Sequence, residues 1–269
     1  MPQITEHAPG WPIWVALNTT DFPLSQGFYT QLFGWDYYTL TLTERGDVNI
    51  FTLGGIQGPE VAGMHPLVDD TEPSSWTCYF RVDDVDAMVD VVKSAGGQEL
   101  SPPTDVADLG RSTLCCDSQG AEFALVRPYN FAGAGVVDEP SAMCWVELAC
   151  RDPGEARRFY HHVFGWQAVD RPSHGSSYTD FKLGEWPVAG MVPMDYSWPP
   201  QYPPQWIPYF AVADCDAIAA RAVGLGARIP TGPDDLPSGR CAILHDPTGA
   251  RLGIIAMRPG DGAACRPFT

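Results

Sequence analysis

The sequence has few basic residues and no long apolar run. Sixteen Lys and Arg stand against 33 Asp and Glu, which gives a net charge of −17. Because clustered basic side chains bind phosphate backbones and anionic lipids, we expect neither nucleic acid nor a membrane as a partner. No apolar run reaches the roughly 18 residues of a spanning helix, and the N-terminus lacks the basic-then-apolar order of a secretory signal. These features predict a cytoplasmic protein.

Several chemical signatures are also missing. The chain has no P-loop, no GxGxxG motif and no Ser/His/Asp order. Its eight cysteines show no CxxC spacing, and most of them stand inside apolar runs, which predicts buried free thiols rather than disulfides. Phosphoryl transfer, dinucleotide chemistry and nucleophilic hydrolysis therefore have no support in the sequence.

What the chain does contain is internal repetition. Residues 28–35 (FYTQLFGW) return almost intact as residues 159–166 (FYHHVFGW). The other recurring segments are 61–64 with 188–191, 80–83 with 210–213, and 117–120 with 246–249. A repeat of about 130 residues has the usual size of one domain. We therefore predict two similar domains, residues 1–130 and 142–269, joined by a linker at residues 131–141.

Each half is predicted to hold two β-α-β-β-β modules. Strand-forming residues 13–19 are followed by Asp21 and Pro23, which mark a helix start, and the helical pattern ends at Gly34. Three short extended segments separated by Gly-containing turns complete the unit. The order recurs three more times, and the proline-rich residues 196–208 are predicted to be a rigid connector. The expected modules are residues 11–66, 75–128, 142–194 and 205–258.

This set of motifs resembles the vicinal oxygen chelate superfamily, which includes glyoxalase I, bleomycin resistance proteins and extradiol dioxygenases. The resemblance rests on the helix-start Asp, the Phe-Tyr pair, the Gly-Trp helix end and the Asp-x-x-Gly hairpin, and it extends from Trp11 to about Met257. It is closest to the two-domain glyoxalase-like proteins common in actinobacteria. It implies an α+β fold in which each pair of modules curls into a mixed-sheet cup, holding a divalent metal or, in the drug-binding branch, only a ligand.

The resemblance also suggests where a metal would be held. Members that bind a metal take His, Gln or Glu ligands from the first and last strands of the modules, and these side chains suit an ion that keeps positions open for substrate oxygens. Alignment on the helix-start aspartates puts other residue types there. The occupants are Trp14, Trp145, Thr77, Ile207, Ala124 and Gly253. We therefore expect no metal and no other cofactor. His65 is the one unusual ligand to consider, and its alternative is a turn residue before Pro66.

Strand alternation predicts which side chains face the cups. Trp14 and Trp145 would form aromatic walls with few polar groups, which suit a flat organic ligand. The alternative is that both tryptophans fill the cups as core. The predicted ligand-binding residues are Trp14, Asn18, Tyr38, Tyr79, Arg81, Trp145, Tyr178 and Tyr209.

Glu147 is the predicted catalytic residue. It shares the face of Trp145, and its counterpart in the first half is Ala16. An apolar cup disfavours the charged carboxylate, so we expect a raised pKa that suits general acid or base work. The alternative is an ion pair with Arg151 or Arg251.

The leading functional prediction is a metal-independent protein that binds a small, aromatic metabolite or antibiotic in a Trp-walled cup. The alternative is an isomerase, cyclase or lyase of secondary metabolism that uses Glu147. A metal-dependent lyase or dioxygenase with unusual ligands ranks last. Because four modules in one chain complete both cups, we expect a monomer or a loose homodimer whose partner is a small molecule.

Overall fold

The computed structural model describes residues 7–42, 46–67, 72–172, 177–196 and 198–258. Within these residues the chain forms 17 strands and four helices. None of the described helices is long and apolar enough to span a membrane. The predicted α+β fold, with one curled mixed sheet in each half of the chain, is confirmed.

Two curled sheets are formed, one by each half of the chain. The first half contributes β1 (Pro12–Thr19), α1 (Phe22–Phe33), β2 (Asp36–Leu42), β3 (Gly46–Thr52), β4 (Glu60–Pro66), β5 (Ser75–Arg81), α2 (Val85–Ser94), β6 (Gln98–Glu99), β7 (Thr104–Val106), β8 (Gly110–Cys116) and β9 (Glu122–Pro128). Their order in the sheet is β2-β3-β4-β1-β5-β9-β8-β6, with β7 paired to β8. The two modules are thus joined through the antiparallel pair β1 and β5.

The second half repeats this plan. Its elements are β10 (Met143–Cys150), α3 (Pro153–Phe164), β11 (Gln167–Pro172), β12 (Ser177–Leu183), β13 (Trp186–Pro193), β14 (Gln205–Ala211), α4 (Cys215–Gly224), β15 (Arg228–Leu236), β16 (Gly239–His245) and β17 (Arg251–Met257). The order β11-β12-β13-β10-β14-β17-β16-β15 matches that of the first sheet. We call the concave faces of the two sheets the first cup and the second cup.

The module order predicts a strand after α4, but the sequence pattern did not locate β15. Its sequence Arg-Ile-Pro-Thr-Gly-Pro-Asp-Asp-Leu contains two prolines and a cis Gly232–Pro233 bond. Proline has no N–H to donate to a β-ladder, so its presence argues against a central strand. A strand at the edge of a sheet tolerates it. β15 is such an edge strand, and its pairing with β16 is irregular.

The repeated helix starts behave as their sequence predicts. The Asp21 side chain accepts a hydrogen bond from the Leu24 N–H at 3.0 Å, and that of Asp152 accepts one from Glu155 N–H at 2.9 Å. These contacts satisfy N–H groups that have no partner in the first helical turn. Gly34 ends α1 with φ of 71°, a left-handed conformation that favours glycine.

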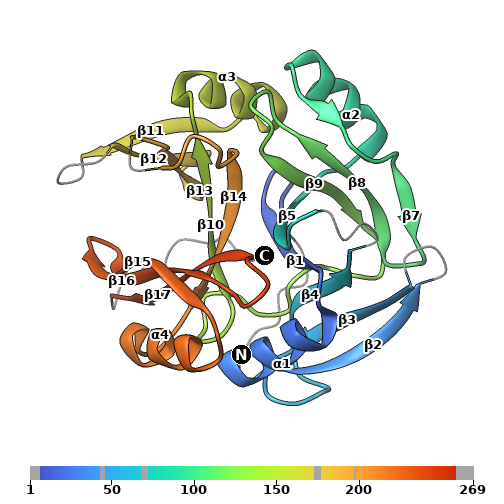
Figure 1. Cartoon of the computed structure of the whole chain (residues 1–269). Coiled ribbons are helices and arrows are strands. Elements are labelled where there is room, and N and C mark those ends of the chain that lie inside the picture. Colours follow the sequence, from blue (N-terminus) through green and yellow to red (C-terminus); the bar gives the residue numbers. More distant parts are fainter. Residues whose placement is uncertain (1–6, 43–45, 68–71, 173–176, 197, 259–269) are drawn as a thin grey trace.

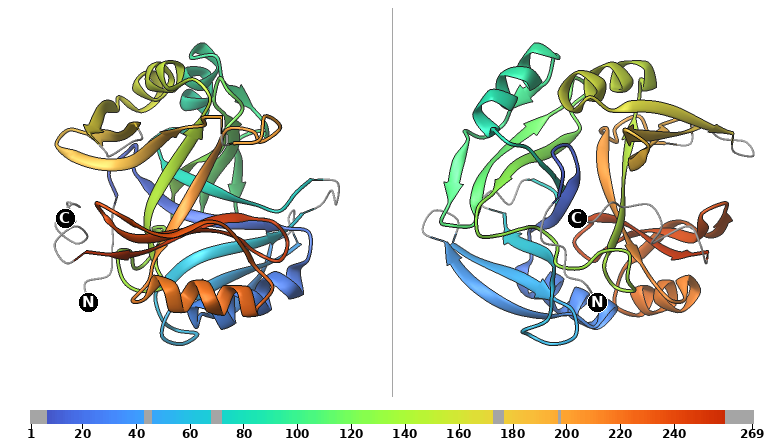
Figure 2. Two further views of the ribbon diagram at one scale, coloured as in Figure 1. Left: turned by 60° about the vertical axis from the view of Figure 1, so that its left-hand side comes forward. Right: turned by 180° about the vertical axis from the view of Figure 1, so that it is seen from behind.

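The helices of one half pack against those of the other. Figures 1 and 2 show α1 beside α4 on one side of the molecule and α2 beside α3 on the opposite side, and both pairs are in contact. Strands β5 and β14 also meet near the centre. The two cups therefore open away from each other, and one continuous apolar core lies between the sheets.

The duplicated Phe-Tyr and Asp-x-x-Gly motifs contact each other across this interface. The Tyr29 hydroxyl donates to Asp246 at 2.9 Å, and that of Tyr160 donates to Asp117 at 3.0 Å. Both tyrosines are fully buried. The Phe-Tyr motif of each half thus contacts the Asp-x-x-Gly motif of the opposite half.

Replacing Tyr160 by phenylalanine should lower the free energy of unfolding by about 1.5–3 kcal/mol, because it removes a buried hydrogen bond to a carboxylate. Trp206, whose indole N–H donates to Tyr160 at 2.9 Å, would lose its acceptor as well. Urea denaturation measures the change. The Tyr29→Phe variant is the matched copy and should lose a similar amount; a loss below about 0.5 kcal/mol in both would contradict the assignment.

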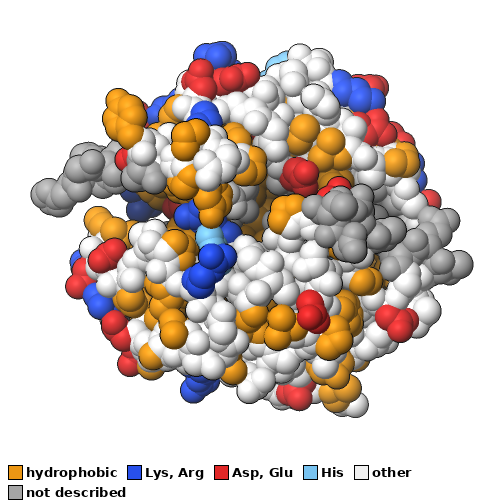
Figure 3. Space-filling view, viewed as in Figure 1, with side chains coloured by type: hydrophobic (Ala, Val, Ile, Leu, Met, Phe, Trp, Pro, Cys, Tyr) orange, Lys and Arg blue, Asp and Glu red, His pale blue; other side chains and the backbone are white. Residues whose placement is uncertain are grey.

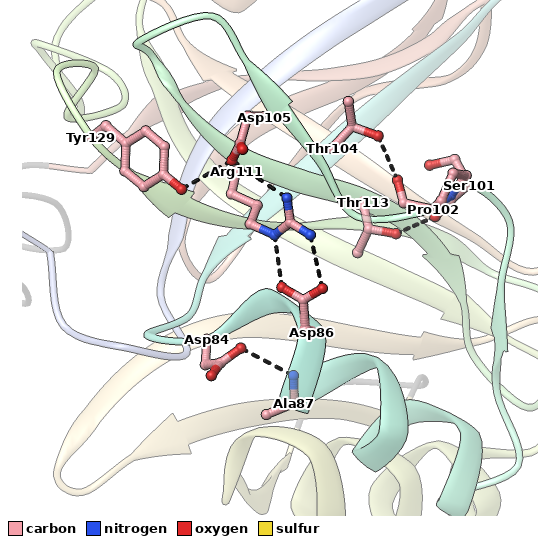
Figure 4. A network of polar contacts seen from close by, with 10 residues as sticks. All are labelled: Asp84, Asp86, Ala87, Ser101, Pro102, Thr104, Asp105, Arg111, Thr113 and Tyr129. Carbon is pink, nitrogen blue, oxygen red and sulfur yellow. Dashed lines mark hydrogen bonds and ion pairs between the residues drawn. The ribbon is translucent and has the colours of Figure 1, made fainter.

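Ion pairs tie the second helix of each half to its sheet. Arg111 of β8 binds both carboxylate oxygens of Asp86 at 2.7 and 2.8 Å and lies 3.4 Å from Asp105 (Figure 4). Arg240 of β16 pairs with Asp216 in the same bidentate way. The cups are therefore held at corresponding places in both halves.

All seven described cysteines are free, as predicted, and six are buried.

Candidate functional site

The first cup contains a cavity of about 100 Å³. Trp14, Tyr38 and Tyr79 line it, as does Phe131 from the chain that follows β9. The Phe131 ring meets Trp14 edge to face with ring centroids 4.7 Å apart. The remaining lining consists mainly of aliphatic side chains, together with Glu60, His65 and Ser112. This wall is aromatic and apolar, as pockets for flat organic ligands commonly are.

Of the residues predicted for the first cup, three line the cavity and two do not. Trp14, Tyr38 and Tyr79 belong to the lining, and Tyr38 donates a hydrogen bond to Glu60. Asn18 instead donates to Thr77 at 3.0 Å, across β1 and β5. Arg81 forms an ion pair with Asp83 at 2.9 Å. These last two side chains thus serve local contacts.

The second cup holds a buried polar network at its floor. Glu147 of β10 accepts a hydrogen bond from the Tyr209 hydroxyl at 2.9 Å and another from Tyr178. Tyr178 in turn accepts one from the Trp145 indole N–H at 2.8 Å. The four residues predicted for this cup are therefore brought together. Ala149, Ile207 and Ile255 belong to the apolar cluster around them.

Burial dominates the electrostatics of Glu147. It raises the pKa of this carboxyl above its ordinary value, while the bonds from Tyr209 and Tyr178 and the positive charge of Arg251 act in the opposite direction. The pKa of both tyrosines is raised by burial and by the charge of Glu147. No ion pair joins Glu147 to Arg151 or Arg251 among the interactions of the described residues. The structure therefore contradicts the alternative that Glu147 forms an ion pair with Arg151 or Arg251.

Two glycines make room for this network. A Cβ on Gly190 would lie 1.9 Å from the Tyr178 hydroxyl oxygen, and one on Gly253 would lie 2.3 Å from the Tyr209 ring. Both distances are far shorter than any van der Waals contact. Glycine at these positions is thus a steric requirement for both tyrosines.

A proline-rich connector between β13 and β14 covers one end of the second cup. Trp198 and Tyr202 from this connector pack on the apolar lining of the cup. The Arg251 guanidinium lies 4.2 Å from the centre of the Trp198 ring, and Tyr202 stacks on His245. Arg151 donates to the carbonyl of Pro199 at 2.8 Å, which holds the connector from the other side.

The residues of the cups do not fit the divalent metal that the fold implies. Trp14 and Trp145 have no lone pair to offer a metal, and the Tyr209 ring lies where a side chain at position 253 would begin. Glu147 already accepts hydrogen bonds from two tyrosines. Within the described part of the chain, no three His, Cys, Asp or Glu side chains are grouped so that they could hold a metal. The residues at these positions therefore do not form a site for that metal.

Sequence reasoning missed Phe131 and Trp198, and it considered Arg251 only as an ion-pair partner of Glu147. Phe131 and Trp198 lie in connections, where strand alternation gives no information about direction. The pairing of β17 with β14 is what places Arg251 on the concave face. A systematic comparison of the two repeats could have found Arg251, because Glu122 stands at its counterpart position.

Comparison with known proteins agrees with this architecture. Residues 11–125 match the family described as "Glyoxalase/Bleomycin resistance protein/Dioxygenase superfamily", and residues 145–255 match "Glyoxalase-like domain". The chain belongs to this superfamily, as its motifs predicted.

Relatives match over nearly their whole length. The "Putative glyoxylase CFP32" of Mycobacterium tuberculosis is 38% identical, over 96% of this chain and 99% of that protein. "Anthracycline biosynthesis protein DnrV" of Streptomyces peucetius is 36% identical, over 97% of this chain and 98% of that protein.

Solved structures support the fold alone. The Mn(II)-bound glyoxalase from Novosphingobium aromaticivorans aligns with a TM-score of 0.62 at 15% identity, over 100% of this chain and 87% of that one. The 2,3-dioxygenase LapB from Pseudomonas sp. KL28 aligns with a TM-score of 0.63 at 12% identity, over 93% of each chain.

Proposed function

We propose that this protein binds a small aromatic molecule in the first cup without a metal. The observation that carries the proposal is the cavity walled by Trp14, Tyr38, Tyr79 and Phe131. Four rings around an apolar space favour a flat ligand, because aromatic faces and edges stack on one another with specific geometry. The name of the Streptomyces peucetius relative supports the same class, since an anthracycline carries flat fused rings.

The size of the cavity limits what can enter without rearrangement. A volume of about 100 Å³ suits roughly one ring. Phe131 lies outside the strands, so it can move without breaking the sheet. Its displacement costs about 1 kcal/mol for the edge-to-face contact with Trp14, in addition to the packing of the ring on the core. We propose that fused-ring ligands enter by displacing this ring.

Binding is tested by thermal shift and calorimetry with flat probes that range from phenol to anthraquinone-2-sulfonate. A probe at a hundred times its dissociation constant should stabilise the fold by about 2.7 kcal/mol. Ser112→Phe, which fills the cavity, should abolish this gain. Cys241→Phe is the matched control, because Cys241 takes the corresponding place in the second cup, and it should retain binding. No stabilisation by any probe would refute the proposal.

The second candidate function is proton transfer by Glu147, in an isomerase, cyclase or lyase reaction. It is favoured by one observation, the buried carboxyl that two tyrosine hydroxyls hold in place. A carboxyl with a raised pKa is a better proton carrier near neutral pH. Loss of such a group should reduce turnover roughly 10²- to 10⁴-fold.

Glu147→Gln should change the pH dependence of stability. Because the folded-state pKa of Glu147 is raised, its stability contribution is present below the ordinary glutamate pKa of about 4.3 and is lost as pH rises through the folded value. The variant has no such loss, so its stability relative to the parent protein should improve as pH rises above that window. Urea denaturation between acidic and mildly basic pH measures this. A difference that stays constant with pH would remove Glu147 as a titrating group.

A further inference from the structure

The clearest difference between the two cups is one row of side chains across the concave face. In the second cup, strand pairing aligns one residue from each of β12, β13, β10 and β14, and β17 continues the row. Its members are Asp180, Gly190, Glu147, Ile207 and Arg251. The place of Arg251 follows from Gly253, two residues later, which pairs with Tyr209.

The duplication supplies an internal reference for this row. The matching residues of the first cup are Ile50, Gly63, Ala16, Thr77 and Glu122. The second cup thus has Asp180 and Glu147 where the first cup has Ile50 and Ala16, and Arg251 where the first has Glu122. The glycine is common to both. The first cup therefore has one ionisable residue in this row, Glu122 at one wall, whereas the second cup has three, one at each wall and one at the floor.

Asp180 forms one charged wall. Its side chain is 4% exposed, and one carboxylate oxygen, Oδ2, forms an ion pair with Arg171. The other oxygen, Oδ1, is buried and accepts no hydrogen bond from the residues that the structure describes. A buried acceptor without a donor is costly, so it marks a place where a partner fits.

Arg251 forms the opposite wall. Its Nε–H is buried and has no acceptor within the described chain, and its guanidinium is stacked on the Trp198 ring. Stacking fixes the plane of the guanidinium and leaves its N–H edge available for an oxygen. Figure 3 shows a hollow on the left of the molecule, between the surface over β11 and β12 and that over β15 to β17, with basic side chains at its margin.

We propose that the second cup is a separate binding site for a hydroxylated organic acid. The carboxylate of the ligand binds Arg251, and a hydroxyl at its other end donates to Asp180. The planar guanidinium fork matches a carboxylate, and a carboxylate oxygen that lacks a donor matches a hydroxyl. Glu147 then lies between the two ends of the ligand. This site does not depend on aromatic binding in the first cup.

The test uses three hydroxy acids of increasing span, 4-hydroxybenzoate, 4-hydroxycinnamate and 6-hydroxy-2-naphthoate, in calorimetry with the full chain. Each is compared with its methyl ester, which removes the anion, and with the acid that lacks the hydroxyl. At least one hydroxy acid should bind, and both of its truncated forms should bind roughly tenfold to a hundredfold more weakly, as expected for hydrogen bonds to charged groups.

Variants assign the two ends. Arg251→Gln should remove the preference for the acid over its ester, and Asp180→Asn should remove the preference for the hydroxylated form. Arg251→Lys keeps the positive charge but loses the planar guanidinium fork, so it should weaken binding of the acid. This variant still tests the anion-binding end of the site if Asp180→Asn does not fold. Glu122→Gln, at the matching place in the first cup, should change nothing.

Other outcomes overturn the proposal. If no hydroxy acid binds, or acid and ester bind equally, Arg251 is not an anion site. If Glu122→Gln weakens binding as much as Arg251→Gln does, the ligand does not bind specifically in the second cup. The Ser112→Phe variant separates the two sites, because it should abolish aromatic binding in the first cup and leave hydroxy-acid binding intact.

Discussion

Replacing Phe210 by alanine should lower the free energy of unfolding by about 3–5 kcal/mol, as for other large buried aromatics. Phe210 is fully buried, and its ring centroid lies 5.1 Å from that of Phe33, 5.5 Å from Trp35 and 5.4 Å from Trp76. These three partners belong to the other half of the chain. Removal of the ring therefore opens a cavity in the interface between the two sheets. Urea denaturation followed by tryptophan fluorescence measures the change.

The duplication provides the control for Phe210. Phe80 takes the same place in the other half, where it contacts Phe164, Trp166 and Trp206. Phe80→Ala should therefore cost a similar amount. Ile56 is 58% exposed, so Ile56→Ala should change stability by less than about 0.5 kcal/mol. If the two phenylalanine variants lost no more than this, the halves would not be held together by their aromatic core.

The fold could be predicted because repetition and helix-start chemistry are local signals. Asp21 caps a helix in the structure as its sequence predicts, and Gly34 ends that helix. The interface between the halves could not be predicted in the same way. The sequence contains two copies of the Phe-Tyr motif, with Tyr29 and Tyr160, and two of the Asp-x-x-Gly motif, with Asp117 and Asp246. It does not show which tyrosine contacts which aspartate. The structure pairs Tyr29 with Asp246, which only the packing of α1 beside α4 decides.

The candidate sites were predictable to a smaller degree. Alternation along a strand placed Trp14 and Glu147 on the concave faces, because neighbouring residues point to opposite sides. It could not show that Asp180 and Arg251 lie in the same row as Glu147, since a row is set by the register between strands. Nor could it show that Phe131 reaches the first cup, because it lies outside the strands. Register and connections are long-range properties of the chain.

The two cups carry the same ladder of strands but different chemistry, and a glycine shared by both allows a direct test. Gly190→Ala should disrupt the second cup, because the new Cβ would lie 1.9 Å from the Tyr178 hydroxyl oxygen and 2.7 Å from the indole nitrogen of Trp145. Tyr178 must then move and give up its hydrogen bonds to Trp145 and Glu147. Overpacking costs about 1–3 kcal/mol, and the buried polar groups left without partners add about 1–3 kcal/mol. We expect a total loss of about 2–6 kcal/mol in the free energy of unfolding, measured by urea denaturation.

The corresponding change in the first cup separates sterics from the polar network. A Cβ on Gly63 would meet its nearest neighbour, the Trp14 indole nitrogen, at 3.2 Å, so Gly63→Ala requires a shift of only a few tenths of an ångström. Its cost should stay below about 1.5 kcal/mol. Pairing Gly190→Ala with Tyr178→Phe removes the shortest clash, that with the hydroxyl oxygen, and should recover part of the loss; contacts of 2.6 Å to the ring carbon Cζ and 2.7 Å to the Trp145 nitrogen remain. Equal losses for the two glycine variants, or no recovery in the pair, would mean that Tyr178 is not held between Trp145 and Glu147 as the structure shows.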